Sequence, residues 1–197
     1  MATGRQRLFD TEQALDAAML IFWKNGYSGT SIASLTTAMG INKPSMYAAF
    51  GNKEQLFLTT VERYVQKHGF PHAEKLILGS QSLKERLRLY LSSIAEMQMD
   101  CDLPGGCFVT NSSCEYGGDL LPEKAAQAIK LINSNTQSGL LTFFKNEQQI
   151  GNLVSDTSAE ALVSFLQAIN NGMAVMARAG TSKNELESII NQALKAL

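Results

Sequence analysis

Two short helical segments that lie close together within residues 26–57 constrain the fold of this chain more than any other feature. The first carries apolar side chains at helical spacing and is stopped by Gly40, a residue type that ends helices by adopting a left-handed conformation. The second is opened by Asn42 as N-cap and has Pro44 in its first turn, where the missing N–H costs nothing. Two brief helices across a short Gly-containing turn indicate a helix-turn-helix, whose second helix normally enters a DNA major groove.

The helices expected on either side of this pair complete a small head. Asp10 or Thr11 can cap an earlier helix, whose apolar side chains recur at the spacing of one helical face. Asn52 opens a later helix in a variant of the capping box. This later helix is predicted to end near Gly69 and Pro71.

The rest of the chain shows helical periodicity throughout and no alternating β pattern. Five further helices are expected, over residues 82–99, 106–116, 122–151, 157–179 and 182–197. We therefore predict an all-α protein of about nine helices. It consists of a three-helix helix-turn-helix domain over residues 1–57 and a larger helical domain over residues 58–197.

The charge balance changes sign along the chain. The formal net charge is −1, with +2 on residues 1–75 and −3 on residues 76–197. This asymmetry has the sign expected for a DNA-binding head on an acidic body. No apolar run is long enough to span a bilayer, and the first ten residues lack the apolar stretch of a signal peptide. We therefore expect a cytoplasmic protein with no membrane partner.

No enzymatic, metal or disulfide chemistry is expected. The three cysteines are an odd number, and the two histidines lie far from them in the sequence, which argues against both a disulfide framework and a zinc site. The chain also has no phosphate-binding loop and no nucleophile elbow. We therefore predict no cofactor, no metal and no catalytic residue.

A set of spaced elements makes the head more specific than a general helix-turn-helix. They are Gly26-Tyr27, Thr30-Ser31-Ile32, Ala38-Met39-Gly40-Ile41, Ser45-Met46-Tyr47 and Phe50-x-Asn52-Lys53-Glu54-x-Leu56. Over roughly residues 8–57 the chain resembles the DNA-binding domain of the TetR family of bacterial transcriptional regulators, which are mostly repressors. The DNA contacts that this resemblance implies are Thr30, Lys43, Pro44, Ser45, Tyr47 and Lys53.

Elementary chemistry agrees with these contacts. Lys43 can reach a guanine edge or a phosphate, and Tyr47 can donate to a phosphate oxygen. The helix start at Thr30 or Ser31 offers backbone N–H groups to a phosphate. Two other interpretations stay open: Tyr47 could cover the core from outside, and Lys43 could be a solvated lysine with no DNA contact.

Base recognition by the second helix of the pair is expected to involve few side chains. Ala48 and Ala49 stand where the family often has an aromatic or large polar residue, and their methyl groups offer no hydrogen-bond code. Specificity would then depend on DNA deformability and on two half-sites, which implies a dimer and a near-palindromic double-stranded operator. Arg5 and Arg7 could reach the minor groove or the backbone, or form a solvated tail.

The last two expected helices, residues 157–179 and 182–197, are the candidate homodimer surface. The first is apolar nearly all round. The second has a broad apolar stripe made of Leu186, Ile189, Ile190, Ala193, Leu194 and Leu197. Because such faces must be buried by something, the same pair from a second copy would complete a four-helix bundle, as in the family that the chain resembles. A purely intramolecular core is the alternative.

Adaptable and bulky apolar side chains between the head and these helices suit a pocket for a small, largely apolar effector. The candidate lining residues are Met97, Cys107, Phe108, Asn111, Phe144, Phe165 and Met173. The effector is expected to favour a state that does not bind DNA and so to release the protein from its operator. An ordinary core explains the same apolar residues equally well.

Cys107 supports an alternative mechanism. It follows Pro104-Gly105-Gly106 at an expected helix start, a position that favours a reactive thiolate. The chain could therefore be a thiol-based regulator that senses electrophiles or oxidants. No Lys, Arg or His lies nearby in the sequence, however, and a small buried apolar residue is the other interpretation of Cys107.

Overall fold

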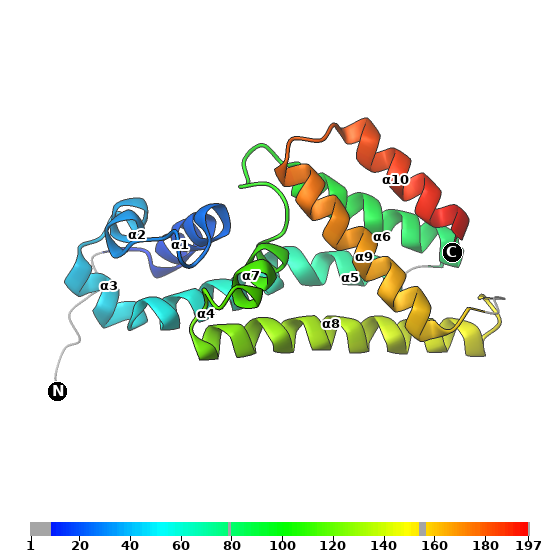
Figure 1. The fold of residues 1–197 in the computed structure, drawn as a ribbon, viewed down its shortest axis with the longest axis horizontal. Coiled ribbons are helices and arrows are strands. Elements are labelled where there is room, and N and C mark those ends of the chain that lie inside the picture. The colour runs from blue at the N-terminus through cyan, green and yellow to red at the C-terminus, as the bar shows by residue number, and fades with distance from the viewer. Residues whose placement is uncertain (1–8, 79, 154–156, 197) are drawn as a thin grey trace.

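The protein is described by a computed structural model over residues 9–78, 80–153 and 157–196. These residues form ten α-helices and one π-helical turn, with no strand among them, so the predicted all-α class is confirmed (Figure 1). The helices are α1 (Thr11–Asn25), α2 (Ile32–Met39), α3 (Lys43–Phe50), α4 (Lys53–Tyr64), α5 (Phe70–Ile77), α6 (Leu83–Gln98), α7 (Phe108–Gly117), α8 (Glu123–Gln149), α9 (Ala159–Arg178) and α10 (Lys183–Ala196), with the π-helical turn η1 (Val65–Gly69) between α4 and α5. Arg5, Arg7 and Leu197 lie outside the described residues.

The head is built by the local rules that its sequence obeys. The side chain of Asp10 caps α1, and Ser31 rather than Thr30 caps α2. Asn42 caps α3 by accepting a hydrogen bond from the Ser45 N–H at 2.9 Å. Gly40 has φ 65° and ψ 26°, the left-handed conformation that the sequence predicts between α2 and α3. The helix-turn-helix is therefore present as α2 and α3.

The helix that leaves the head is longer than predicted. Instead of ending near Gly69, α4 widens into η1 and continues as α5. The Phe70 N–H bonds to the carbonyl of Val65, five residues back, and this wider turn accommodates Pro71, which has no N–H of its own. Gly69 and Pro71 therefore mark a local change of helix type rather than a helix end, which accounts for one helix more than the nine expected.

The buried apolar side chains form two clusters. The head cluster joins α1 to α4 with the start of α7 and α8, and its largest members are Phe22, Trp23, Phe57 and Phe108. The body cluster joins α5, α6, α8, α9 and α10. Each fully buried aromatic side chain stabilises the fold by roughly 1.5–3 kcal/mol. The head cluster extends beyond residue 57, so the head is packed onto the body over a shared core.

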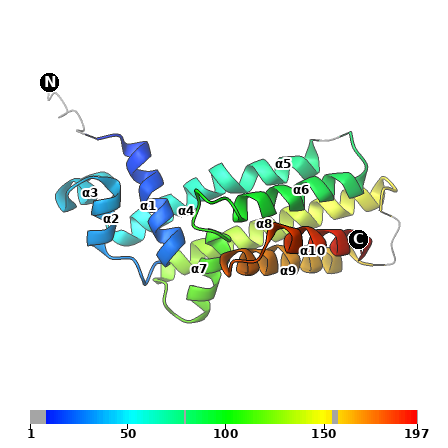
Figure 2. The same cartoon turned by 90° about the horizontal axis from the view of Figure 1, so that it is seen from above.

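The last two helices, α9 and α10, differ in whether their apolar side chains are exposed to solvent. In Figures 1 and 2, α10 lies along α6, and α9 crosses α8. Leu186, Ile190, Ala193 and Leu194 are buried in the body cluster, so the same chain covers most of the α10 stripe that was assigned to a partner. The outer face of α9 stays uncovered.

Among the described residues, no helix is both long and apolar enough to cross a membrane.

Candidate functional site

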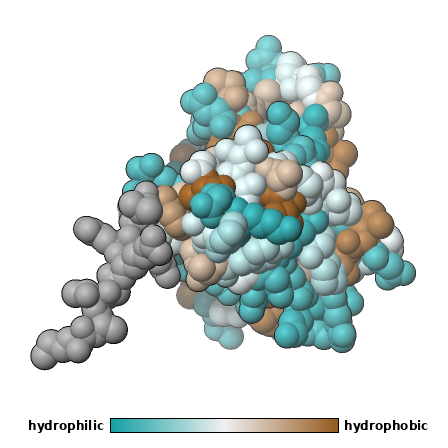
Figure 3. All heavy atoms as spheres, turned by 90° about the vertical axis from the view of Figure 1, so that its left-hand side faces the viewer, coloured by the Kyte–Doolittle hydropathy of each residue, from teal (hydrophilic) through white to brown (hydrophobic). Residues whose placement is uncertain are grey.

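The outer face of α3 carries the side chains that the sequence assigns to DNA. Lys43, Pro44 and Tyr47 are exposed and Ser45 is half-buried, while Met46 anchors the helix in the head cluster. Tyr47 is 41% exposed, so its ring does not serve as a lid on the core. The end of the molecule that carries α2 and α3 faces the viewer in Figure 3 and is mostly hydrophilic, with small hydrophobic spots. This face is open to a polar partner.

Lys43 and Tyr47 stand one turn apart on α3, and the ammonium of Lys43 lies 5.8 Å from the centre of the Tyr47 ring. A cation at this distance is attracted to the face of an aromatic ring. The pair therefore presents a positive charge and a phenol ring one helical turn apart on the same face of α3. Lysine and tyrosine side chains are both among the donors that proteins use to bind DNA phosphates.

Thr30 is placed differently from the other five candidate DNA contacts. It is 2% exposed, and its hydroxyl donates a hydrogen bond to the Gly26 carbonyl at 2.6 Å. Its N–H bonds to the Tyr27 carbonyl at 3.2 Å. Both donors of Thr30 are thus used inside the head, and the residue shapes the turn that precedes α2.

Lys53 lies at the start of α4, with its ammonium 4.2 Å from the centre of the Tyr27 ring. Burial lowers the pKa of Lys53, and the nearby Glu115 carboxylate opposes that shift. The preceding N-cap, Asn52, exchanges backbone-to-side-chain hydrogen bonds with Gln55 at 2.8 and 2.9 Å, as its spacing predicts. Lys53 therefore adds a positive charge to a helix start that already favours anions.

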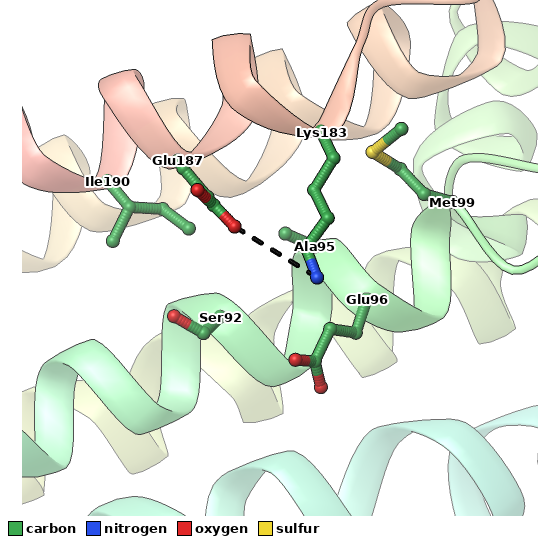
Figure 4. A pocket seen from close by; sticks show the side chains of 7 residues that line it. All are labelled: Ser92, Ala95, Glu96, Met99, Lys183, Glu187 and Ile190. Carbon is green, nitrogen blue, oxygen red and sulfur yellow. Dashed lines mark ion pairs between the residues drawn. The ribbon is translucent and has the colours of Figure 1, made fainter.

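The seven candidate effector residues do not all lie together. Met97, Cys107 and Phe108 belong to the head cluster or pack against it, and Phe144 and Met173 belong to the body cluster. Phe165 is 36% exposed on the outer face of α9. A cavity of about 410 Å³ lies elsewhere, in a groove whose walls are Ser92, Ala95, Glu96, Met99, Lys183, Glu187 and Ile190 (Figure 4). None of the seven residues lines this groove, and its charged rim does not suit an apolar effector.

Sequence reasoning named Cys107 and Asn111 but missed three other buried or half-buried polar side chains, Tyr64, Tyr90 and Asn170. We call Tyr64, Tyr90, Cys107, Asn111 and Asn170 the interior polar cluster. The Tyr64 hydroxyl donates to the sulfur of Cys107 at 3.3 Å, and the Asn170 amide donates to the Tyr90 hydroxyl at 3.0 Å. The Asn111 amide nitrogen and the Asn170 amide oxygen are buried with no partner in the protein. Buried polar atoms of this kind normally bond to water or to a ligand.

Burial raises the pKa values of both tyrosines in the interior polar cluster. The pKa of Tyr64 lies well above its ordinary value and that of Tyr90 rises to about 12, in both cases mainly because the phenolate would be desolvated. Both hydroxyls therefore keep their protons at neutral pH and remain hydrogen-bond donors. The signal that could have revealed the cluster is the adjacent pair Asn170 and Asn171, two amide side chains in the middle of a mostly apolar helix.

The fold and the exposed α3 face define the class of helix-turn-helix regulators with a helical body. Two family models match: one described as bacterial regulatory proteins, tetR family, over residues 14–60, and one described as a Tetracyclin repressor-like C-terminal domain, over residues 84–193. The second match covers more than half of the chain. The protein belongs to the TetR family.

Individual relatives match over nearly the whole chain. The HTH-type transcriptional repressor ComR of Escherichia coli K12 is 33% identical over 98% of this chain and 90% of its own length. A cysteine-substituted CifR in complex with a 26-bp double-stranded operator DNA is 31% identical, with a TM-score of 0.82 over 98% of this chain and 99% of that chain. The reduced form of Escherichia coli NemR is 18% identical with a TM-score of 0.76 over 94% of this chain and 95% of that chain, which shows a shared fold alone.

Proposed function

We propose that this protein is a dimeric transcriptional repressor that reads a near-palindromic operator with α3 and is released by a small, largely apolar effector. The exposed face of α3, with Lys43 and Tyr47 adjacent on it, is the observation that carries the proposal. CifR, at 31% identity, was solved on operator DNA, and ComR is named as a repressor. We place its action in the cytoplasm, where bacterial DNA lies, and assign it no catalytic role.

Each candidate contact has a separate task on the DNA. Lys43 reads a guanine edge or binds a phosphate, and Pro44 and Ser45 offer an apolar contact and a hydrogen bond to bases. Tyr47 and Lys53 bind phosphates. Thr30 acts indirectly, because its buried hydroxyl orders the turn before α2. With so few side chains reaching bases, specificity requires two half-sites.

The outer stripe of α9 is the surface that we propose for the second copy. It consists of Ala161, Phe165, Ala168, Gly172 and Val175, continued by Ala179 just after the helix, all of them exposed. Small residues at alternate turns let two helices approach closely, and Phe165 and Val175 supply the apolar area. The outer face of α10 is polar and suits the rim of such an interface. The outer stripe of α9, with the polar face of α10 at its rim, is thus our proposed dimer contact in place of the apolar stripe of α10.

The effector is best accommodated beside the interior polar cluster. The free amide nitrogen of Asn111 would bind an acceptor on the effector, and the side chains of Met97 and Phe108 would cover its apolar part. Phe108 is buried and Met97 packs against the same cluster, so an effector must select a state in which the helices are further apart. If that state holds the two heads at another distance, the operator is released.

A thiol-based response of Cys107 is the second candidate, because one contact favours it. The Tyr64 hydroxyl donates to the sulfur, and this donor would stabilise the thiolate, the form that attacks an electrophile. The CifR complexes were solved with cysteine-substituted variants. Cys107 is half-buried, so only a small reagent would reach it.

One experiment separates these possibilities. An operator is first selected from a random DNA library with the wild-type protein, and the complex is then treated with a panel of apolar molecules and, separately, with a quinone or hypochlorite. Reversible release by an apolar molecule that also acts on Cys107→Ser supports the effector. Release by electrophiles alone, lost in Cys107→Ser, supports the thiol mechanism. A wild-type protein that selects no DNA sequence overturns the proposal as a whole.

A further inference from the structure

The end of α1 is held by a side chain from the body. The Glu115 carboxylate, on α7, accepts hydrogen bonds from the Tyr27 N–H at 2.8 Å, from the Ser28 N–H at 3.0 Å and from the Ser28 hydroxyl at 2.7 Å. Successive backbone N–H groups that converge in this way form an anion-binding nest. The turn between α1 and α2 thus binds a carboxylate of the body as it would bind a free anion.

Gly26 makes this contact possible. It ends α1 with φ 74°, a conformation that residues with a side chain rarely adopt. A Cβ atom at Gly26 would lie 2.7 Å from a carboxylate oxygen of Glu115, closer than real Cβ contacts allow. Glycine at position 26 therefore allows both the positive φ angle and the close approach of the Glu115 carboxylate.

A second side chain from the body holds the last turn of α1. Arg178, at the end of α9, donates hydrogen bonds to the Lys24 carbonyl at 2.6 Å and to the Trp23 carbonyl at 3.3 Å. The last carbonyls of a helix lack partners within the helix and carry the negative end of its dipole, so a guanidinium is well suited to bind them. Arg178 binds the carbonyl groups at the end of α1, and Glu115 binds the N–H groups just after it.

α7 is linked to both contacts at the end of α1, the one made by Glu115 and the one made by Arg178. Gly106, just before α7, packs on α9 so closely that a Cβ atom there would lie 2.7 Å from the Ala174 carbonyl and 3.2 Å from Cβ of Arg178. The last turns of α7 carry Glu115. Figure 2 shows α7 and the end of α9 next to the end of α1. A displacement of α7 would therefore disturb both contacts with the head.

We propose that Glu115 and Arg178 are positioning residues that fix the orientation of the DNA-binding head on the body, with α7 as the element that links them. α2 begins at Ile32, four residues after Ser28, so the orientation of the held turn sets the orientation of α2 and α3. In a dimer this orientation decides the distance between the two α3 helices. The inference rests on the proposed function, and its tests include one that needs no DNA.

The first test measures how strictly the protein selects the spacing of two half-sites. Affinities of the wild type, Glu115→Gln, Arg178→Gln and the double variant are compared on the selected operator and on operators with one base pair added or removed between half-sites. In Glu115→Gln an amide NH2 replaces one acceptor oxygen and faces backbone N–H donors. Glu123→Gln, at an exposed position on α8, and Arg88→Gln, at a half-buried position on α6 where the guanidinium bonds to Asn191 and not to the head, are matched controls.

Each single variant is expected to lose about fivefold or more of the wild-type preference for the correct spacing, the lower range of coupling between sites in proteins. The controls are expected to keep that preference. A residue that only stabilises the fold would lower the affinity equally on all three operators. That result, or an unchanged preference in both variants, overturns the proposal.

The second test uses amide hydrogen exchange on the protein without DNA. If the two contacts act together through α7, Arg178→Gln increases exchange at the Tyr27 and Ser28 amides, although Arg178 does not bond to them. If each substitution affects only its own partners, the contacts are independent and the proposal fails, whether or not the protein binds DNA. A wild type that selects no operator instead contradicts the proposed function alone.

Discussion

The Tyr64 hydroxyl donates a hydrogen bond to the sulfur of Cys107 at 3.3 Å, so the helix that leaves the head meets the residue that precedes α7. Tyr64 also packs edge-on against the Trp23 ring at 4.9 Å between ring centres. A change at the sulfur would therefore act directly on Tyr64 of α4 and, through the Tyr64 ring, on Trp23 of α1.

Removing the Tyr64 hydroxyl is expected to slow the reaction of Cys107. In Tyr64→Phe the sulfur loses the donor that stabilises its charged form, while the ring still fills the core. Alkylation by iodoacetamide, followed residue by residue with mass spectrometry, should become several-fold slower at Cys107. Cys101 and Cys114 are exposed and serve as internal controls. An unchanged rate at Cys107 would show that the hydroxyl has no effect on the sulfur.

Lys43→Ala and Tyr47→Ala are each expected to abolish operator binding. Both side chains are exposed, so their removal should change the free energy of unfolding by about 0.5 kcal/mol or less. Gel-shift titration on the selected operator measures the first effect, and thermal unfolding measures the second. Lys75→Ala, at an exposed position on α5, is the control for loss of one positive charge. Wild-type affinity in both variants would remove α3 as the DNA-contacting helix.

Phe165→Asp is expected to convert the proposed dimer to a monomer. Phe165 is 36% exposed in the chain alone, and a second copy would bury it against small residues of its own α9. A carboxylate in that contact would be desolvated without a partner. Sedimentation velocity measures the mass, and Ser188→Asp on the polar face of α10 is the control. A Phe165→Asp variant that stays dimeric would place the interface elsewhere.

Acid is expected to weaken the contact between α1 and α4. The hydrogen bond from Arg63 is the largest cause that lowers the pKa of Asp16, from 3.8 to about 2; partial burial opposes the shift and Lys67 adds to it. A carboxyl with a lowered pKa in the folded state contributes stability that is fully present above pH 3.8 and is lost as the pH falls towards 2. Urea unfolding should therefore show Asp16→Asn less stable than the wild type at pH 6, with the difference shrinking between pH 4 and pH 2. A difference that stays constant over this range would exclude the ion pair as its cause.

Local patterns were enough to predict most of the helices and their starts. Asp10, Asn42 and Asn52 cap helices as expected, because capping depends on residues within one turn. Gly40 ends α2 for the same local reason. The identity of the head therefore follows from a short stretch of sequence.

Contacts between distant segments could not be predicted in this way. A helical pattern shows that one side of α10 is apolar, but it does not tell whether α6 or a second copy covers that side. Glu115 and Tyr27 are 88 positions apart, and nothing in the sequence around either residue indicates the other. The continuation of α4 into α5 could not be predicted because a proline usually ends a helix. Here the wider turn of η1 makes room for Pro71.

Replacing Asn111 by leucine is expected to separate effector binding from folding. The Asn111 amide nitrogen is buried without a partner, so an apolar side chain of similar volume removes an unsatisfied donor and should leave thermal stability unchanged or slightly raised. An effector that places an acceptor against this nitrogen would bind the variant more weakly, by about tenfold for each 1.4 kcal/mol lost. Operator release is titrated with an active molecule from the panel, using wild type, Asn111→Leu and, as a control on the same helix, Ser113→Ala. An Asn111→Leu variant that responds at the same concentration as the wild type would show that the effector binds without this amide.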